Sequence, residues 1–124
     1  MRPPIIIGGG PAGATAALEL RRAGQAVTVL ERLEEPADKV CGDLLGAGAI
    51  RAAQVLGVDP FALGASPLTH LRIIRGRGEA RTKLPFRAAG LSRRIFDDAL
   101  LRCAEIAGAE VRRGIIGRGP RLVD

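Results

Sequence analysis

The sequence predicts an α/β fold that is built on parallel strands. A short β-branched run, Ile5–Ile7, stops at a glycine and is followed by a helical pattern of apolar residues over 11–23. A second apolar run, Ala26–Leu30, comes soon after that pattern. A strand, a helix and a strand within about 30 residues form a βαβ unit, in which the two strands run parallel. Because Ile5–Ile7 is apolar at every position, we expect this first strand to be buried.

Small residues define the first helix. Gly13, Ala17 and Leu20 are spaced to lie on one face, which we expect to pack closely against the sheet. Gly24 is a natural end for this helix.

A polar loop and a second helix are expected next. Residues 34–42 form the loop, and Asp43 can cap a helix that runs to about Leu56 and ends at Gly57. The apolar positions of that helix share one face: Leu45, Ala49, Ala52 and Leu56.

The middle of the chain predicts an antiparallel pair of strands. Residues 69–75 and 79–84 have the composition of strands, and the Arg-Gly-Arg-Gly sequence between them provides a turn.

The clearest helix begins at Ser92, which can cap it. Asp97 and Asp98 are expected in its first turn, where the helix dipole stabilises negative charge. Gly108 ends the helix, and Glu110–Ile116 is expected to form a further strand. The apolar positions of the helix repeat at helical spacing: Phe96, Ala99, Leu100, Cys103 and Ala107.

Composition excludes several classes of protein. The chain has 124 residues, of which 47% are hydrophobic, so it is long enough for one small folded domain. Two cysteines and one histidine provide neither a disulfide framework nor a four-ligand zinc site. No apolar run reaches the length of a membrane span. The apolar N-terminus is interrupted by glycines and a proline at residues 8–11, unlike a signal peptide, so we expect a cytoplasmic protein with reduced thiols.

The basic charge does not predict a nucleic-acid partner. The net charge is +6, and 17 of the 19 basic residues are arginines scattered along the chain. The chain has no Lys/Arg block and no Trp or Tyr on which bases could stack, so we expect no nucleic-acid binding.

A glycine-rich turn carries the strongest functional signal. Residues 8–13, Gly-Gly-Gly-Pro-Ala-Gly, fit the pattern G-x-G-x-x-G between a strand and a helix, the context in which this pattern indicates a dinucleotide site. In such a turn Gly8 permits the tight bend and Gly10 lets a pyrophosphate approach the backbone. Gly13 lets the helix and strand pack closely, while N–H groups at the helix start bind phosphate.

Glu31 completes the dinucleotide pattern. It ends the second strand, near the spacing expected for an acid that binds ribose hydroxyls. A carboxylate there also repels a 2′-phosphate, which disfavours NADP. The predicted fold is therefore a Rossmann-like βαβ unit with an inserted antiparallel β-hairpin, and the spacing alone leaves both NAD and FAD open.

A family resemblance selects FAD. The segment GGGPAGATAALELRRAGQAVTVLER, residues 8–32, resembles the opening of flavoprotein oxidoreductases of the aromatic-hydroxylase type. In that superfamily this segment binds the adenosine and pyrophosphate of FAD. The resemblance therefore places these residues at the cofactor: Gly8, Gly10, Pro11, Ala12, Gly13, Glu31 and Arg32.

Two further segments strengthen the resemblance. The run KVCGDLL at residues 39–45 is similar to the Lys-x-Cys-Gly loop of the geranylgeranyl reductase family, which implies that Lys39, Cys41 and Gly42 lie near the flavin. The run LSRRIFD at residues 91–97, with the helix and Ala-Glu-Val that follow, is similar to the superfamily's R-x-x-F-D…GA-x-V segment. In relatives the arginine that matches Arg93 faces FAD.

The resemblance also implies a division of the chain and a chemistry. Residues 1–33 would be the dinucleotide-binding βαβ unit, 66–90 the start of the β insertion of a substrate domain, and 91–118 the return to the FAD domain. Reduced FAD would either saturate an isoprenoid double bond or react with oxygen to hydroxylate a substrate, with NAD(P)H or another donor supplying electrons. The substrate would be a small molecule, isoprenoid or aromatic, and an isoprenoid would suggest contact with a membrane although no anchor is visible.

Two alternatives remain open from the sequence. One is an NAD-dependent Rossmann dehydrogenase, which does not account for the antiparallel pair at residues 69–84. The other is a truncated, non-catalytic nucleotide-binding fragment, because the family's downstream Gly-Asp motif and most of its substrate domain lie outside these 124 residues, which leaves the fold incomplete relative to the family.

The remaining reactive side chains predict no catalytic group. Cys41 has the basic neighbours Lys39 and Arg32 in sequence, which would lower the pKa of its thiol, but no base is paired with it. Cys103 is expected in the core, and His70 is expected to be structural. Paired carboxylates for acid–base catalysis are absent from the pattern, as expected where a flavin carries the chemistry.

Overall fold

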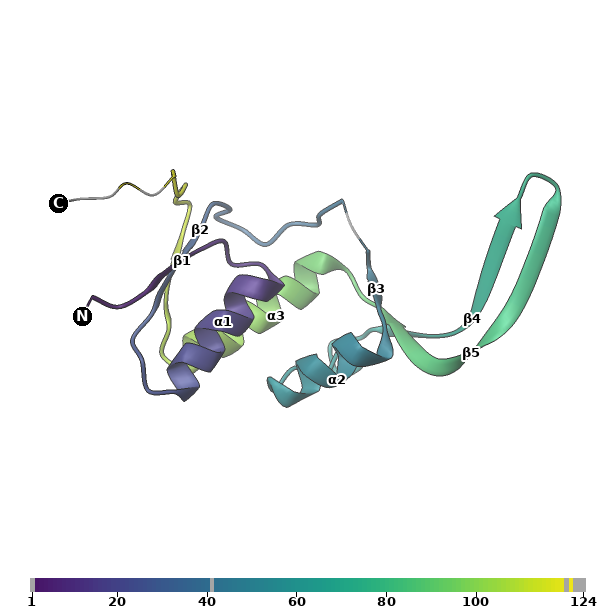
Figure 1. Cartoon of the computed structure of the whole chain (residues 1–124), viewed down its shortest axis with the longest axis horizontal. Helices are drawn as coiled ribbons and strands as arrows, with labels where there is room; N and C mark the ends of the chain where they lie inside the picture. Colours follow the sequence, from purple (N-terminus) through teal and green to yellow (C-terminus); the bar gives the residue numbers. More distant parts are fainter. Residues whose placement is uncertain (1, 41, 120, 122–124) are drawn as a thin grey trace.

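The computed structural model describes residues 2–40, 42–119 and 121. The molecule is elongated, with a parallel sheet and two helices at one end and a long antiparallel hairpin at the other (Figure 1). The elements in chain order are β1 (Ile5–Ile7), α1 (Pro11–Arg22), β2 (Thr28–Glu31), β3 (Leu44–Leu45), α2 (Ala47–Val55), β4 (Ser66–Arg75), β5 (Gly78–Gly90), α3 (Arg93–Ile106) and β6 (Glu110–Arg113).

The predicted parallel sheet is confirmed. It has the order β1-β2-β6, and both neighbouring pairs are parallel. The central strand, β2, begins at Thr28 rather than at Ala26, and β6 ends at Arg113 rather than at Ile116. The early end of β6 has a local cause, since Gly114 has a φ of +72° and turns the chain out of the strand.

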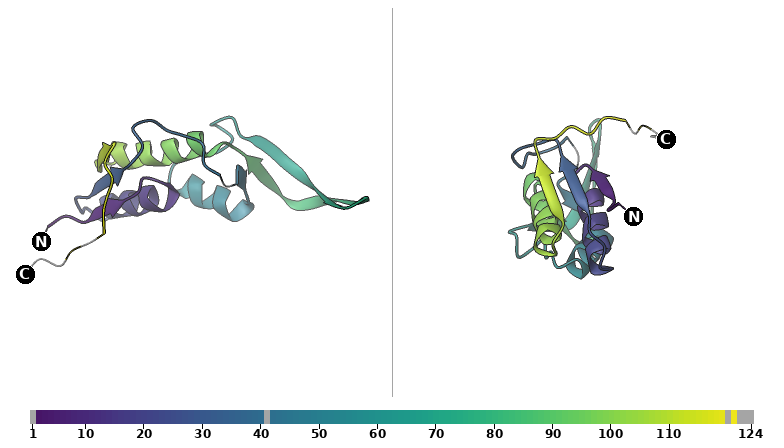
Figure 2. Two further views of the ribbon diagram at one scale, coloured as in Figure 1. Left: turned by 90° about the horizontal axis from the view of Figure 1, so that it is seen from above. Right: turned by 90° about the vertical axis from the view of Figure 1, so that its left-hand side faces the viewer.

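Only one face of the parallel sheet is covered. Helices α1 and α3 lie side by side and share a core with Val29 of β2, which is fully buried (Figure 2). Ile5 and Ile7 of β1 are 64% and 61% exposed. The prediction of a buried first strand is therefore wrong, because these two side chains point to the face that lacks helices.

The buried face of α1 is rotated slightly from the prediction. Its buried residues are Ala14, Ala17 and Leu18, and Leu20 packs at the edge of the core. Small side chains on this face let α1 approach both α3 and the sheet.

The second helix begins later than predicted. Leu44 and Leu45 form β3, which pairs with Gly90 and Ala89 of β5, and α2 starts at Ala47. Asp43 therefore does not cap a helix. The buried residues of α2 are Ile50 and Ala53, which differ from the apolar face that was predicted. The two leucines belong to the sheet because their partners are supplied by residues far along the chain.

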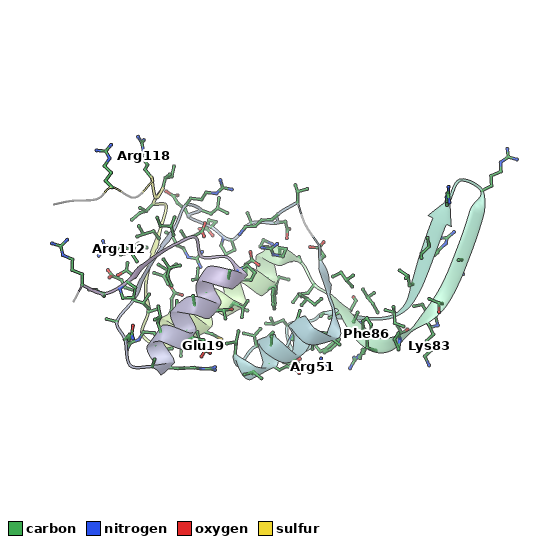
Figure 3. The ribbon with its side chains drawn as sticks, viewed as in Figure 1. Glu19, Arg51, Lys83, Phe86, Arg112 and Arg118 are labelled. Atoms are coloured by element: carbon green, nitrogen blue, oxygen red, sulfur yellow. The ribbon has the colours of Figure 1, made fainter. Side chains whose placement is uncertain are left out.

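The predicted antiparallel pair is confirmed and is longer than predicted. Strands β4 and β5 pair from Arg75 opposite Gly78 down to Ser66 opposite Gly90, with one register shift after Leu68. Every residue of β4 is exposed. Figure 3 shows Lys83 and Phe86 on β5, at the end of the molecule away from the parallel sheet.

Helix α3 is capped as predicted. The Ser92 hydroxyl accepts a hydrogen bond from the backbone N–H of Ile95 at 3.4 Å. Asp97 and Asp98 lie beyond the first turn, contrary to the prediction, and both form ion pairs. Cys103 is partly buried against the core. The fully buried positions of α3 hold it to α1 and the sheet: Phe96, Leu100, Leu101 and Ala104.

Within the described part of the chain, no helix combines the length and apolarity needed to cross a bilayer.

We predict that Leu101→Ala destabilises the protein by about 2–5 kcal/mol, because it leaves a cavity at a side chain that is only 2% exposed. The control is Ile106→Ala on the same helix, where the side chain is 87% exposed and the change should stay within about 0.5 kcal/mol. Urea unfolding followed by circular dichroism measures both. Equal losses for the two variants would contradict the placement of α3.

Candidate functional site

The glycine-rich turn joins β1 to α1. Its glycines allow other groups to come close to the backbone. Gly8 has a φ of +101°, and its N–H donates to the carbonyl of Leu30 at 2.8 Å. A Cβ on Gly13 would lie 1.9 Å from the Gly8 carbonyl oxygen, so any side chain there forces the backbone apart. A Cβ on Gly10 would meet only the Nζ of Lys39, at 3.9 Å. Gly10 therefore leaves open space beside the turn, while Gly8 and Gly13 are needed for the conformation of the turn.

Glu31 ties the turn to the central strand. Its Oε2 accepts a hydrogen bond from the N–H of Gly9 at 2.6 Å, and its Oε1 accepts one from the N–H of Leu33 at 2.9 Å. The residue is 7% exposed. Each carboxylate oxygen can accept more than one hydrogen bond, so Glu31 keeps capacity for a hydroxyl donor.

The surroundings of Glu31 favour its ionised form. Burial raises the pKa of the carboxyl, but the backbone hydrogen bonds from Leu33 and Gly9 lower it, with help from the charges of Lys39 and Arg113. The net result is a pKa below the ordinary value of 4.5. Glu31 is therefore an acceptor at neutral pH.

Gly9 is a site residue that the sequence pattern treats as variable. A Cβ at this position would lie 2.9 Å from Cδ2 of Leu101 and 3.0 Å from Oε2 of Glu31. A side chain here would therefore separate the turn from both α3 and Glu31. The signal was available in the run of three glycines, where the motif requires glycine only at alternate positions.

Five of the predicted cofactor residues line one cavity of about 360 Å³, namely Gly8, Gly10, Glu31, Arg32 and Lys39, whereas Gly13, Gly42 and Arg93 are not part of its lining. Pro11 and Ala12 begin α1 beside it, and the first turn of that helix carries no acidic side chain. The helix dipole there favours an anion. The cavity is lined by Ile7, Gly8, Gly10, Leu30, Glu31, Arg32, Lys39, Ile115, Ile116 and Gly117.

Lys39 and Arg93 come from distant segments and meet at Asp97. Nζ of Lys39 lies 3.0 Å from Oδ2 of Asp97. Arg93 donates through Nε and Nη2 to the two oxygens of the same carboxylate, at 2.8 and 3.0 Å. Sequence reasoning named both cations as cofactor residues and missed Asp97, for which the only signal was its spacing of four residues from Arg93 on a helix.

Of the other reactive residues within the described part of the chain, His70 does not line this cavity. Cys41 is outside the described residues, and Gly42 follows it with open space around its Cα. His70 is exposed on β4 and contacts Thr69, at 2.9 Å between Oγ1 and Nδ1. In the described part of the chain, no group of three His, Cys, Asp or Glu side chains is placed to hold a metal ion.

Comparison with known proteins gives a family match over nearly the whole chain. Residues 3–114 match the FAD binding domain family. The chain is 30% identical over 115 residues to a menaquinone reductase of Mycobacterium tuberculosis, a match that covers 89% of this chain and 28% of that protein. It is 47% identical over 61 residues to the squalene monooxygenase of Mus musculus, covering 48% of this chain and 10% of that one.

A solved structure shares the fold. The geranylgeranyl bacteriochlorophyll reductase-like protein of Thermoplasma acidophilum is 25% identical, with a TM-score of 0.74 over 90% of this chain and 30% of that chain. The chain thus spans less than a third of the length of each of these proteins.

We predict that Glu31 makes part of the stability depend on pH. Its folded-state pKa lies below the ordinary value of 4.5, so near that pH the unfolded chain binds more protons and stability rises with pH. The stability that ionised Glu31 contributes is fully present above the ordinary pKa of 4.5, and it is lost as the pH falls through the folded-state pKa. Urea unfolding of the wild type and of Glu31→Gln from pH 7 to pH 3 measures it.

The gap between the two unfolding free energies should narrow as the pH falls below 4.5. Taking the difference between the unfolding free energies of the wild type and Glu31→Gln removes the pH dependence that the other carboxylates contribute to both proteins. A gap that stays constant across this range would show that the Glu31 carboxylate is not stabilised by its contacts in the folded state.

Proposed function

Since the chain belongs to the FAD binding domain family, we propose that it is the FAD-binding segment of a flavin-dependent oxidoreductase. The observation that carries the proposal is the meeting of the glycine turn, Glu31 and Lys39 at one cavity. FAD is the cofactor of this family, and when bound it supplies the two-electron chemistry that the side chains here lack.

The residues present fit the adenosine diphosphate half of FAD. Gly10 leaves the open space that a pyrophosphate needs, and the start of α1 and Lys39 supply positive potential beside it. Glu31 has lone pairs left for ribose hydroxyls. Arg32 lies at the exposed rim of the cavity.

An NAD-dependent dehydrogenase is disfavoured. The turn and Glu31 alone would suit either dinucleotide. The family match is to FAD-binding proteins, and the hairpin of β4 and β5 stands where such a dehydrogenase would continue its parallel sheet.

We assign three parts of the chain to different roles. Residues 1–33 form the dinucleotide-binding unit, 66–90 begin the β insertion of a substrate domain, and 91–118 return to the FAD domain. Support for the insertion comes from the exposure of the whole of β4, since a two-stranded hairpin is marginally stable unless further structure packs on it.

The whole enzyme is proposed to act on an isoprenoid substrate, either by reducing a double bond or by hydroxylation. Support for this class comes from the relatives, which are named as a menaquinone reductase, a squalene monooxygenase and a geranylgeranyl reductase-like protein. NAD(P)H is the proposed electron donor, and the cytoplasm is the proposed location. Catalysis is proposed to require the additional length that the relatives possess.

Mass spectrometry distinguishes the two chemistries. The whole enzyme, loaded with flavin and reduced with NAD(P)H, is incubated with a geranylgeranyl lipid with and without oxygen. A gain of two hydrogen atoms without oxygen identifies a reductase, and a gain of one oxygen atom in air identifies a monooxygenase. An unchanged lipid under both conditions, from a protein whose flavin is reduced, would reject an isoprenoid substrate.

FAD titration tests the binding function directly. We predict saturable quenching of flavin fluorescence by the 124-residue chain. Gly10→Ala should raise the Kd by about tenfold or more, because the new Cβ fills the space left for the pyrophosphate. Its unfolding midpoint should change little, since nothing but the tip of Lys39 lies within 4 Å.

The matched control is Gly48→Ala in α2, an exposed glycine with no atoms within 4 Å of the added Cβ. This variant should bind FAD as the wild type does. A wild-type chain that folds but does not bind FAD would overturn the proposed function for this chain.

A further inference from the structure

Asp97 is a buried carboxylate that binds two cations from separate parts of the chain. Its side chain is 10% exposed, and it is contacted by Lys39 of the loop after β2 and by Arg93 of the first turn of α3. Lys39 is 58 residues away in sequence. Burial of a charge is costly unless it is paired, so each of these contacts is part of the reason that Asp97 can be ionised in this position.

The loop that carries Lys39 is held in place at a second point. Oδ1 of Asp38 accepts a hydrogen bond from the backbone N–H of Arg94 at 3.2 Å. Two neighbouring residues of the loop thus contact α3. Asp38 does so through its carboxylate and Lys39 through its ammonium. The Lys39 ammonium is left beside Gly10, where a Cβ would lie 3.9 Å from Nζ.

Asp97 does not neutralise both of its cations. Lys39 and Arg93 share its single negative charge, so these three groups together carry one positive charge. The Glu31 carboxylate balances that charge overall, but its oxygens are engaged by backbone N–H groups. Of the two cations, Lys39 is the one that lines the cavity beside the glycine turn, so its ammonium is placed to bind the charge of an incoming diphosphate.

We propose that Asp97 is a positioning residue for FAD, which holds Lys39 at the glycine turn and anchors Arg93 on the same carboxylate, so that the ammonium is in place before the cofactor's pyrophosphate arrives. The inference rests on the proposed FAD-binding function. Asp97 itself accepts from the two cations and does not contact the cofactor. Its effect on affinity comes from lowering the cost of ordering two long side chains when FAD binds.

The neighbouring residue Asp98 provides a matched control. It also lies on α3 and also pairs with two cations, Arg113 at 2.9 Å and Arg102 at 2.6 Å. Neither of these arginines lines the cavity beside the glycine turn. Loss of either carboxylate removes two ion pairs from the same helix, but only Asp97 holds a cation that lines this cavity, Lys39.

The first measurement is FAD affinity of Asp97→Asn and Asp98→Asn, at a temperature where both variants are folded. Asp97→Asn should raise the Kd by about tenfold, because the ammonium and guanidinium lose their shared anchor. Asp98→Asn should stay within about twofold of the wild type. Equal effects of the two variants would reduce Asp97 to a structural role, and tighter binding by Asp97→Asn would show that the carboxylate opposes the cofactor; either result overturns the proposal.

The second measurement follows Lys39 without FAD. The chain has only two lysines, so acetylation by an N-hydroxysuccinimide ester, read by peptide mass spectrometry, compares Lys39 with the exposed Lys83 as an internal reference. Asp97→Asn should speed acetylation of Lys39 severalfold relative to Lys83, Asp98→Asn should not, and FAD should slow it in the wild type.

The two measurements separate the possible failures. An unchanged Lys39 rate in Asp97→Asn shows that the carboxylate does not hold the ammonium, and it overturns the positioning role whether or not FAD binds. Absence of FAD binding by the wild type overturns the proposed function, and with it the cofactor part of this inference, even where the labelling shows that Lys39 is anchored.

Discussion

The carboxylate of Glu31 makes the contacts on which the arrangement of the proposed FAD half-site depends. One oxygen binds the N–H of Gly9 in the turn between β1 and α1, and the other binds the N–H of Leu33 where the chain leaves β2. The backbone carbonyl of the same residue accepts from the N–H of Ile115, just beyond β6. A single residue at the end of the central strand therefore connects the loops that follow all three parallel strands. Its position requires Gly9 to lack a side chain, which makes the run of three glycines a packing requirement as well as a phosphate-binding pattern.

Sequence alone predicted the parts of the fold that depend on local contacts. The cap at Ser92, the strand at Ile5–Ile7 and the two-residue turn between β4 and β5 involve residues that are close in the chain, and composition suffices to identify them. The prediction at Asp43 failed because Leu44 and Leu45 are strand residues only through Ala89 and Gly90, whose pairing no local pattern reveals. For the same reason the glycine turn was found from its spacing, whereas Asp97 was not, since its partner Lys39 lies 58 residues away.

Two apolar surfaces of this chain, which spans only part of its relatives' length, are exposed to solvent. Ile5 and Ile7 are open on the face of the parallel sheet opposite the helices, and Leu71 and Ile73 are open on the hairpin. Leu71 and Ile73 lie on the face of β4 opposite to that of Arg72, which stands opposite Arg81 in the register of the two strands. Such faces are normally buried by further structure. They support the proposed division in which the hairpin begins a larger sheet.

Most of the net positive charge lies away from the glycine turn. Residues 66–90 contain six of the cationic residues and only one acidic residue, so most of the net charge of +6 belongs to the hairpin region. At the opposite end of the molecule the acids Glu31, Asp97 and Asp98 lie close to Lys39, Arg94 and Arg113, so that acids and bases nearly balance there. Exposed charges interact weakly beyond the Debye length of about 8 Å at physiological salt. The hairpin cations therefore contribute little to the field at the glycine turn. The proposed attraction of a diphosphate there depends on the few groups beside the turn, which are the start of α1 and Lys39, held by Asp97.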